Sequence, residues 1–150
     1  MPAARYSRAG KVRLATEALL ALLWARLMLQ RTTPRDVLHL NHRASDRAAS
    51  GGLGADLGAV DAGCADVVFI IPRLAPRVPW RSDCLVQAMA GQRMLARRGI
   101  ASEIAVGTAK NAAGHFEAHA WLNAGGQTIL GGDISRFEPL LRSDGIPPQV

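Results

Sequence analysis

The sequence predicts an α+β fold in which a central helix is followed by an antiparallel sheet, with a helical segment at the N-terminus. Three observations lead to this prediction. A helical pattern runs from Cys84 to Gly99, three strand-like stretches joined by turns follow it, and apolar residues make up 49% of the 150 residues. We divide the chain into an N-terminal helical segment, residues 1–45, and a domain of residues 46–150.

The first predicted element is a helix over about residues 11–30. Leucines cover most of its surface, and Glu17 and Arg26 mark a polar side. The apolar run 18–25 is shorter than the about 20 residues that span a bilayer, and no clear small-residue cleavage site follows it. We therefore favour a helix packed on its own domain or on a partner over a secretory signal or a membrane-surface helix.

The next segments are predicted to be a short helix and a linker. Pro34 ends the first helix, and a second one is expected to run to about His42. His39 and His42 lie three residues apart, but nothing nearby completes a metal site, so we interpret them as surface or partly buried histidines. Residues 44–58 are mainly Ala, Ser, Gly and Asp, a composition typical of a linker.

Residues 57–71 allow two interpretations. The run Val67–Ile71 alone suggests a buried strand, yet large apolar residues recur at helical spacing across the whole segment, which favours a helix. Cys64 is then a small buried hydrophobic residue. Because Cys64 and Cys84 stand in unlike settings, we expect no disulfide and a reduced, cytoplasmic protein.

The central helix is predicted to begin at Cys84. Three prolines between residues 72 and 79 force an extended approach to it, and Ser82 or Asp83 can cap it. Gly99 ends the helical pattern. Strands are predicted at about residues 102–107, 117–122 and 128–130, with turns at 110–114 and 123–126.

The net charge of +6 rests on arginine, since Lys11 and Lys110 are the only lysines. A basic chain suits a nucleic acid, an anionic membrane surface or an acidic peptide. Aromatic residues are only 5%, and neither RNA-binding strands nor a paired-cysteine zinc pattern is present in the sequence. We therefore expect no nucleic-acid partner and favour an acidic peptide. Arg97 and Arg98 offset the dipole at the end of the central helix or dock such a peptide.

Cys84 and His119 are the candidate catalytic residues. A thiol at a helix N-terminus faces unpaired backbone N–H groups, which favour the thiolate, and a histidine that reaches it can take its proton. The plainer alternative is a packed cysteine and a core histidine. His115, Glu117 and His119 alternate and could share a strand face as metal ligands, but Gly114 places His115 in a turn, so we predict no metal and no cofactor.

The stretch from Trp80 to Leu140 resembles the transglutaminase-like cysteine proteases that remove the leader in lasso peptide biosynthesis. The resemblance lies in Pro79–Trp80, in Cys84–Leu85 opening a helix that ends at Ile100, and in three later motifs in the same order, residues 105–108, 118–121 and 131–132. It implies a papain-like or transglutaminase-like core and a Cys-His-Asp triad. It also implies three partners: a precursor peptide, a small leader-binding protein and the lasso cyclase.

Carried over by this resemblance, Cys84 is the nucleophile and His119 the general base and then general acid. The turn after the second strand brings residues 131–133 beside His119, and Asp133 is the only carboxylate there, so we assign it to orient the imidazole. A backbone group of Gly131 or Gly132 is an alternative neighbour, and Asn123 is the alternative orienting side chain.

The sequence thus predicts a cysteine peptidase that removes the leader of a lasso precursor through a thioester on Cys84. Two alternatives stay open. A transglutaminase-type acyl transferase would use the same residues with an amine as acceptor, and a non-catalytic adaptor would bind a peptide or the cyclase through its helical and arginine-rich surfaces.

Overall fold

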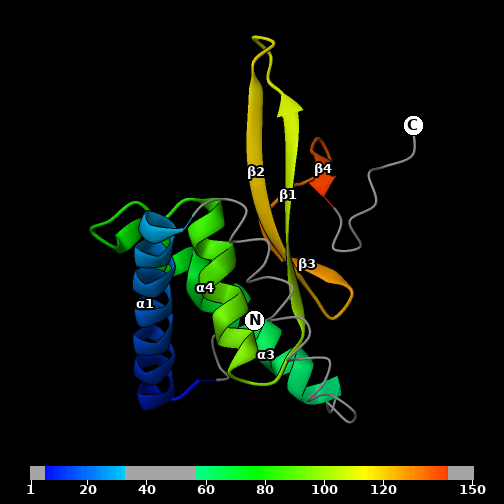
Figure 1. The fold of residues 1–150 in the computed structure, drawn as a ribbon. Coiled ribbons are helices and arrows are strands. Elements are labelled where there is room, and N and C mark those ends of the chain that lie inside the picture. Colours follow the sequence, from blue (N-terminus) through cyan, green and yellow to red (C-terminus); the bar gives the residue numbers. More distant parts are fainter. Residues whose placement is uncertain (1–5, 33–56, 142–150) are drawn as a thin grey trace.

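The computed structural model describes residues 6–32 and 57–141 (Figure 1). The predicted second helix with His39 and His42, most of the predicted linker, and the expected boundary at residue 45 lie outside this part of the chain. Within it, the α+β prediction is confirmed: helices pack beside one four-stranded antiparallel sheet. The elements are α1 (Arg8–Arg31), α3 (Leu57–Leu74), η2 (Ala75–Arg77), α4 (Cys84–Ala96), β1 (Ser102–Lys110), β2 (Phe116–Ala124), β3 (Gln127–Leu130) and β4 (Glu138–Leu141).

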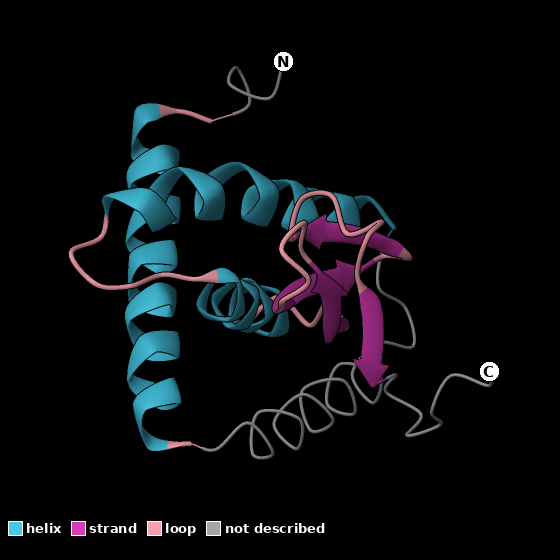
Figure 2. Cartoon of the chain, turned by 90° about the horizontal axis from the view of Figure 1, so that it is seen from above, coloured by secondary structure: helices cyan, strands magenta, loops and turns pink. Residues whose placement is uncertain are grey.

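The elements form layers with α4 at the centre. Helix α4 packs against β1 and β2 on one side and against α1 on the other, and α3 packs against both helices. Figure 2 shows the sheet beyond α4, on the side away from α1. This arrangement makes α4 the helix through which the N-terminal part and the sheet share one core.

Helix α1 begins after Ser7, whose hydroxyl accepts a hydrogen bond from the Gly10 amide at 3.1 Å. Small residues alternate with leucines on its buried side, which lets the helix lie close to its neighbours. The buried residues are Leu14, Ala18, Ala21, Leu22 and Ala25. The prediction that this helix packs on its own domain is therefore confirmed.

Helix α3 confirms the helical interpretation of residues 57–71. Val67 and Ile71, four residues apart, are fully buried, whereas Val68 is exposed, as expected for one face of a helix. Cys64 is only partly buried and packs against the core, and it forms no disulfide. Burial, together with the nearby negative charge of Asp61, raises the pKa of its thiol.

Helix α4 begins at Cys84 as predicted, and Asp83 is its cap: the carboxylate accepts from the Val86 amide at 3.2 Å. Gly91, two turns later, lies where α4 packs closely against side chains of the sheet. A Cβ atom there would stand 2.8 Å from side-chain atoms of Leu122 and Leu130, so the absence of a side chain allows close packing.

The sheet has the strand order β3-β2-β1-β4. The three predicted strands are confirmed, and β1 and β2 pair along their full length from Ser102 opposite Ala124 to Lys110 opposite Phe116. Strand β4 was not predicted. It pairs with β1 at the sheet edge, where Pro139 is tolerated because an edge strand need not donate every backbone hydrogen bond.

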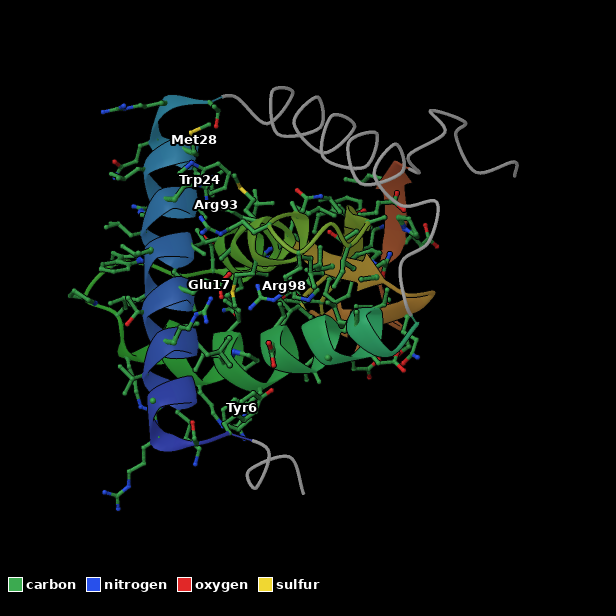
Figure 3. All side chains as sticks on the ribbon, turned by 90° about the horizontal axis from the view of Figure 1, so that it is seen from below. Tyr6, Glu17, Trp24, Met28, Arg93 and Arg98 are labelled. Atoms are coloured by element: carbon green, nitrogen blue, oxygen red, sulfur yellow. The ribbon has the colours of Figure 1, made fainter. Side chains whose placement is uncertain are left out.

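A charged network joins the three helices (Figure 3). The Arg98 guanidinium donates to both carboxylate oxygens of Glu17 at 2.8 Å, and its Nη2 lies 3.5 Å from Asp66 Oδ2. The Tyr6 hydroxyl donates to the other Asp66 oxygen. Burial opposes the charge on Arg98, but the hydrogen bonds and charges of the two carboxylates outweigh it and raise its pKa. Arg98 is therefore a structural residue of the helix cluster.

Candidate active site

Cys84 is the first residue of α4 and is partly buried. The segment before it is held against the helix: the Gln87 side-chain amide donates to the Ser82 carbonyl at 2.9 Å. Two side-chain groups just before Cys84, the indole N–H of Trp80 and the hydroxyl of Ser82, are buried and have no hydrogen-bond partner among the described residues. Such groups are uncommon in folded proteins, so this segment is unusual among the described residues.

His119 lies on β2, and its Nε2 atom is 2.7 Å from the carbonyl oxygen of Gly131. A carbonyl oxygen only accepts, so Nε2 carries the proton in this hydrogen bond. In the neutral imidazole, Nδ1 is then the nitrogen with the free lone pair. The contact therefore orients the ring and leaves Nδ1 as the basic atom.

Gly131 can make this contact because it has no side chain. Its φ is +122°, and a Cβ atom would lie 2.4 Å from the Cβ of Trp121. Both the backbone conformation and the space exclude a larger residue without a shift of the loop. The glycine thus brings its backbone close enough to β2 for the carbonyl to reach His119.

Two aromatic rings flank the imidazole. The Phe137 ring stacks on His119 with a centroid distance of 4.8 Å, and the Trp121 ring lies at 6.4 Å on the same strand. Trp121 is buried, so its ring packs on this side of the imidazole away from solvent. Phe137 was not identified from the sequence, because it belongs to an irregular segment whose path no periodicity describes.

The predicted third residue, Asp133, lies in the loop after β3. Its carboxylate is exposed and accepts from the Ser135 amide at 2.9 Å. This hydrogen bond, the Ser135 hydroxyl and the charge of Arg136 lower the pKa of Asp133. No described hydrogen bond or ion pair joins Asp133 to His119, and the role of Asp133 stays a prediction. Asn123, the alternative, accepts from the Thr128 hydroxyl at 2.8 Å.

The pairing of Cys84 with His119 also stays a prediction. The two residues belong to elements that pack together, α4 and β2, but no described contact joins their side chains. Side chains alternate along a strand. Leu122 points into the core shared with α4, so alternation places His119 and Trp121 on the other face of β2.

The alternating residues His115, Glu117 and His119 do not form a metal site. His115 lies in the turn, as predicted, where its amide donates to the Asn111 side chain. Glu117 pairs with Arg136 at 2.9 Å. Across residues 6–32 and 57–141, no cluster of three potential metal-binding side chains occurs. None of the helices in these two ranges has the length and apolar character needed to cross a bilayer.

A helix with a cysteine at its N-terminus, packed against an antiparallel sheet that carries a histidine, is the arrangement of the papain-like and transglutaminase-like enzymes. The family model described as the transglutaminase-like superfamily matches residues 16–142. The chain therefore belongs to the transglutaminase-like superfamily, which includes cysteine peptidases and acyltransferases. No curated protein and no solved structure matches the chain. The family assignment includes α1, because the matched region begins within that helix.

Proposed function

We propose that this protein is a cysteine peptidase that removes the leader from a ribosomally synthesised lasso precursor peptide. The observation that carries the proposal is the hydrogen bond between His119 Nε2 and the Gly131 carbonyl, in a chain of the transglutaminase-like superfamily. It leaves Nδ1 free to act as a base, and the proposal pairs that nitrogen with the Cys84 thiol. The resemblance of residues 80–140 to lasso leader peptidases supports the substrate class.

In the proposed reaction, Nδ1 takes the proton from Cys84 Sγ, and the thiolate attacks the scissile carbonyl carbon. The carbon–nitrogen bond breaks, the imidazolium gives its proton to the departing amine, and the core peptide leaves with a free N-terminus. The leader remains bound to Sγ as a thioester. The imidazole then takes a proton from water, whose oxygen attacks the thioester carbon. The carbon–sulfur bond breaks, the imidazolium returns its proton to Sγ, and the leader leaves as a carboxylic acid.

The Cys84 side chain starts at the N-terminus of α4, the end at which the helix dipole favours negative charge. Phe137 and Trp121 keep the imidazole in a partly dry, fixed setting. We propose that a small leader-binding protein presents the precursor, as the resemblance to the lasso leader peptidases implies. A lasso cyclase is the proposed recipient of the core peptide.

The test is cleavage of a synthetic lasso precursor peptide by this chain in the presence of a purified leader-binding protein. We expect Cys84→Ala and His119→Ala to abolish cleavage while the circular dichroism spectrum is unchanged, and Cys64→Ala to retain it as the matched cysteine control. Full cleavage by either site variant would overturn the proposal. Mass spectrometry with an added primary amine separates hydrolysis from acyl transfer, because transfer replaces the leader acid with an amide.

The second candidate is a non-catalytic adaptor, favoured by the absence of a described contact between Cys84 and His119 and by the position of His119 on the far face of β2. Limited alkylation at pH 6 distinguishes the two. If the protein is a peptidase, we expect Cys84 to be alkylated rapidly and Cys64 slowly, and we expect His119→Ala to remove this difference in rate. Equal labelling of both cysteines in the presence of the leader-binding protein, with normal precursor processing by Cys84→Ala, would establish the adaptor.

A further inference from the structure

Helix α1 is apolar on both sides, although only one side is buried. Of the eight large apolar side chains that are exposed within residues 6–32 and 57–141, five lie on this helix. They are Val12, Leu19, Leu20, Leu23 and Leu27, and we call them the leucine face of α1. Val12, Leu19, Leu23 and Leu27 follow one another at intervals of seven and four residues, and Leu20 lies beside Leu19 and three residues before Leu23, so the five share one side of the helix. A row of large apolar side chains that faces solvent on a helix is typical of an interaction surface.

A hollow of about 340 Å³ lies beside this face, between α1 and α4. Its lining includes Arg13, Glu17 and Leu20 from α1 and Arg93, Met94 and Arg97 from α4. The leucine face and the hollow together form a groove between two helices, which we call the α1 groove. Its shape suits a convex partner such as a helix.

The charges of the α1 groove are predominantly positive. Three arginines line it against one carboxylate, and that carboxylate, Glu17, already accepts two hydrogen bonds from Arg98. The guanidinium of Arg93 lies 4.3 Å from the centre of the Trp24 ring, which holds it at the groove (Figure 3). Arg97 has only a weak contact with Glu17, at 4.0 Å, and is largely exposed.

Helix α1 also carries two positive charges at its N-terminal end, where the helix dipole makes them unfavourable. Arg8 and Lys11 lie in its first turn, which contains no acidic residue, although the helix dipole favours negative charge there. Positive charge at this end weakens the helix on its own. A negatively charged partner would compensate it, because such a partner would meet both the arginines and the positive end of the helix dipole.

We propose that the α1 groove binds an acidic amphipathic helix of a partner protein, with apolar side chains on the leucine face and carboxylates opposite Arg13, Arg93 and Arg97. A second copy of this chain fits poorly, because a symmetric contact would set the same arginines against each other. An anionic membrane fits poorly too, because a bilayer surface does not fill a hollow and would meet Glu17. The inference goes beyond the proposed peptidase activity and does not rest on it.

The experiment measures binding of a fluorescein-labelled synthetic helix by fluorescence anisotropy, using the full chain. The peptide is about five turns long, with leucines spaced three and four apart and glutamates flanking them. We expect it to bind, and a matched peptide with lysines in place of the glutamates to bind about tenfold more weakly or less. Raising the salt concentration should weaken the binding of the acidic peptide, because salt screens the attraction between its glutamates and the arginines.

Variants then locate the site. The double variant Leu20→Glu, Leu27→Glu should weaken binding of the acidic peptide about tenfold or more. The double variant Arg13→Glu, Arg97→Glu should weaken its binding as much and should strengthen binding of the lysine peptide. Both positions changed on the leucine face are exposed, so the fold should persist, which thermal unfolding checks. Val68→Glu, an equally exposed apolar site on α3, is the matched control and should bind as the unchanged chain does.

Three results would overturn the proposal. The first is no binding of the acidic peptide at millimolar concentration, or equal binding by the groove variants and the Val68→Glu control. The second is binding to vesicles containing phosphatidylglycerol that is lost in the Leu20→Glu, Leu27→Glu variant while the peptide does not bind. The third is a dimer in light scattering that the same variant makes monomeric, which would assign the groove to a second copy.

Discussion

The hydrogen bond between Gly131 and His119 makes a sharp prediction, because the adjacent Gly132 offers a matched control. Both glycines have positive φ, +122° and +66°, but only Gly131 is confined: a Cβ there would lie 2.4 Å from Trp121 Cβ, whereas nothing lies within 4 Å of a Cβ on Gly132. Alanine at position 132 is therefore expected to lower the free energy of unfolding only through its unfavourable backbone conformation, by about 1–2 kcal/mol.

Alanine at position 131 has two costs. The backbone conformation at φ +122° costs about 1–3 kcal/mol, and overpacking against a Cβ that no rotamer can move costs about 1–3 kcal/mol more. The loop can relieve the overlap only by moving about 1 Å, to the ordinary contact distance of about 3.5 Å. That movement carries the carbonyl beyond hydrogen-bonding distance of His119 Nε2, now 2.7 Å away.

We therefore expect Gly131→Ala to lower the free energy of unfolding by about 2–6 kcal/mol, against about 1–2 kcal/mol for Gly132→Ala, as measured by urea unfolding. Imidazole ¹⁵N spectra show which ring nitrogen of His119 carries the proton, a property that general destabilisation does not change. His119 should keep its proton on Nε2 in the unchanged chain and in Gly132→Ala, and should show mixed tautomers in folded Gly131→Ala. Equal destabilisation, or an unchanged tautomer in Gly131→Ala, would refute the reasoning.

Three further predictions concern the helices. Arg98→Met should lower the free energy of unfolding, measured in urea, by about 2–3 kcal/mol. The substitution breaks two charge-assisted hydrogen bonds to Glu17 and leaves that partly buried carboxylate without its main partner. A loss near zero would show that this ion pair contributes as little as an exposed surface pair. Asp83→Ala should cost about 1 kcal/mol through the lost cap, and Asp83→Asn should restore most of it in thermal unfolding. The raised pKa of Cys64 leaves less thiolate at a given pH, so at pH 8 Cys64 should alkylate more slowly than free cysteine, with the difference vanishing above its folded pKa. Asp61→Asn should speed that alkylation, because it removes the negative charge that helps to raise the pKa; an unchanged rate by mass spectrometry would contradict this.

The fold could be predicted where local periodicity and turn residues agree. The spacing of apolar residues in α3 outweighed the strand-like run at its end, because a helix buries Val67 and Ile71 together while leaving Val68 exposed. Strand β4 could not be predicted, because its four residues include Pro139 and show no alternation. Its pairing with β1 depends on a distant segment that only the folded chain brings close.

The candidate site was predictable to the same extent. Cys84 and His119 stand in recognisable local patterns, a capped helix start and a strand, and the structure places them there. The orienting group could not be chosen from the sequence, since a backbone carbonyl has no side-chain signature. The sequence left both Asp133 and the two glycines open, and the observed hydrogen bond goes to Gly131.

A carbonyl in place of a carboxylate changes what the site can do. A carboxylate stabilises the imidazolium that forms when histidine takes the thiol proton, whereas a neutral carbonyl fixes the same tautomer with less electrostatic support. If binding of precursor or partner moves the loop of residues 131–137 so that Asp133 replaces the carbonyl, the imidazole gains a charged orienting partner when substrate arrives. Asp133→Asn would then reduce cleavage in the complete assembly while leaving the imidazole tautomer of the isolated chain unchanged, and an equal cleavage rate would leave Gly131 as the sole orienting group.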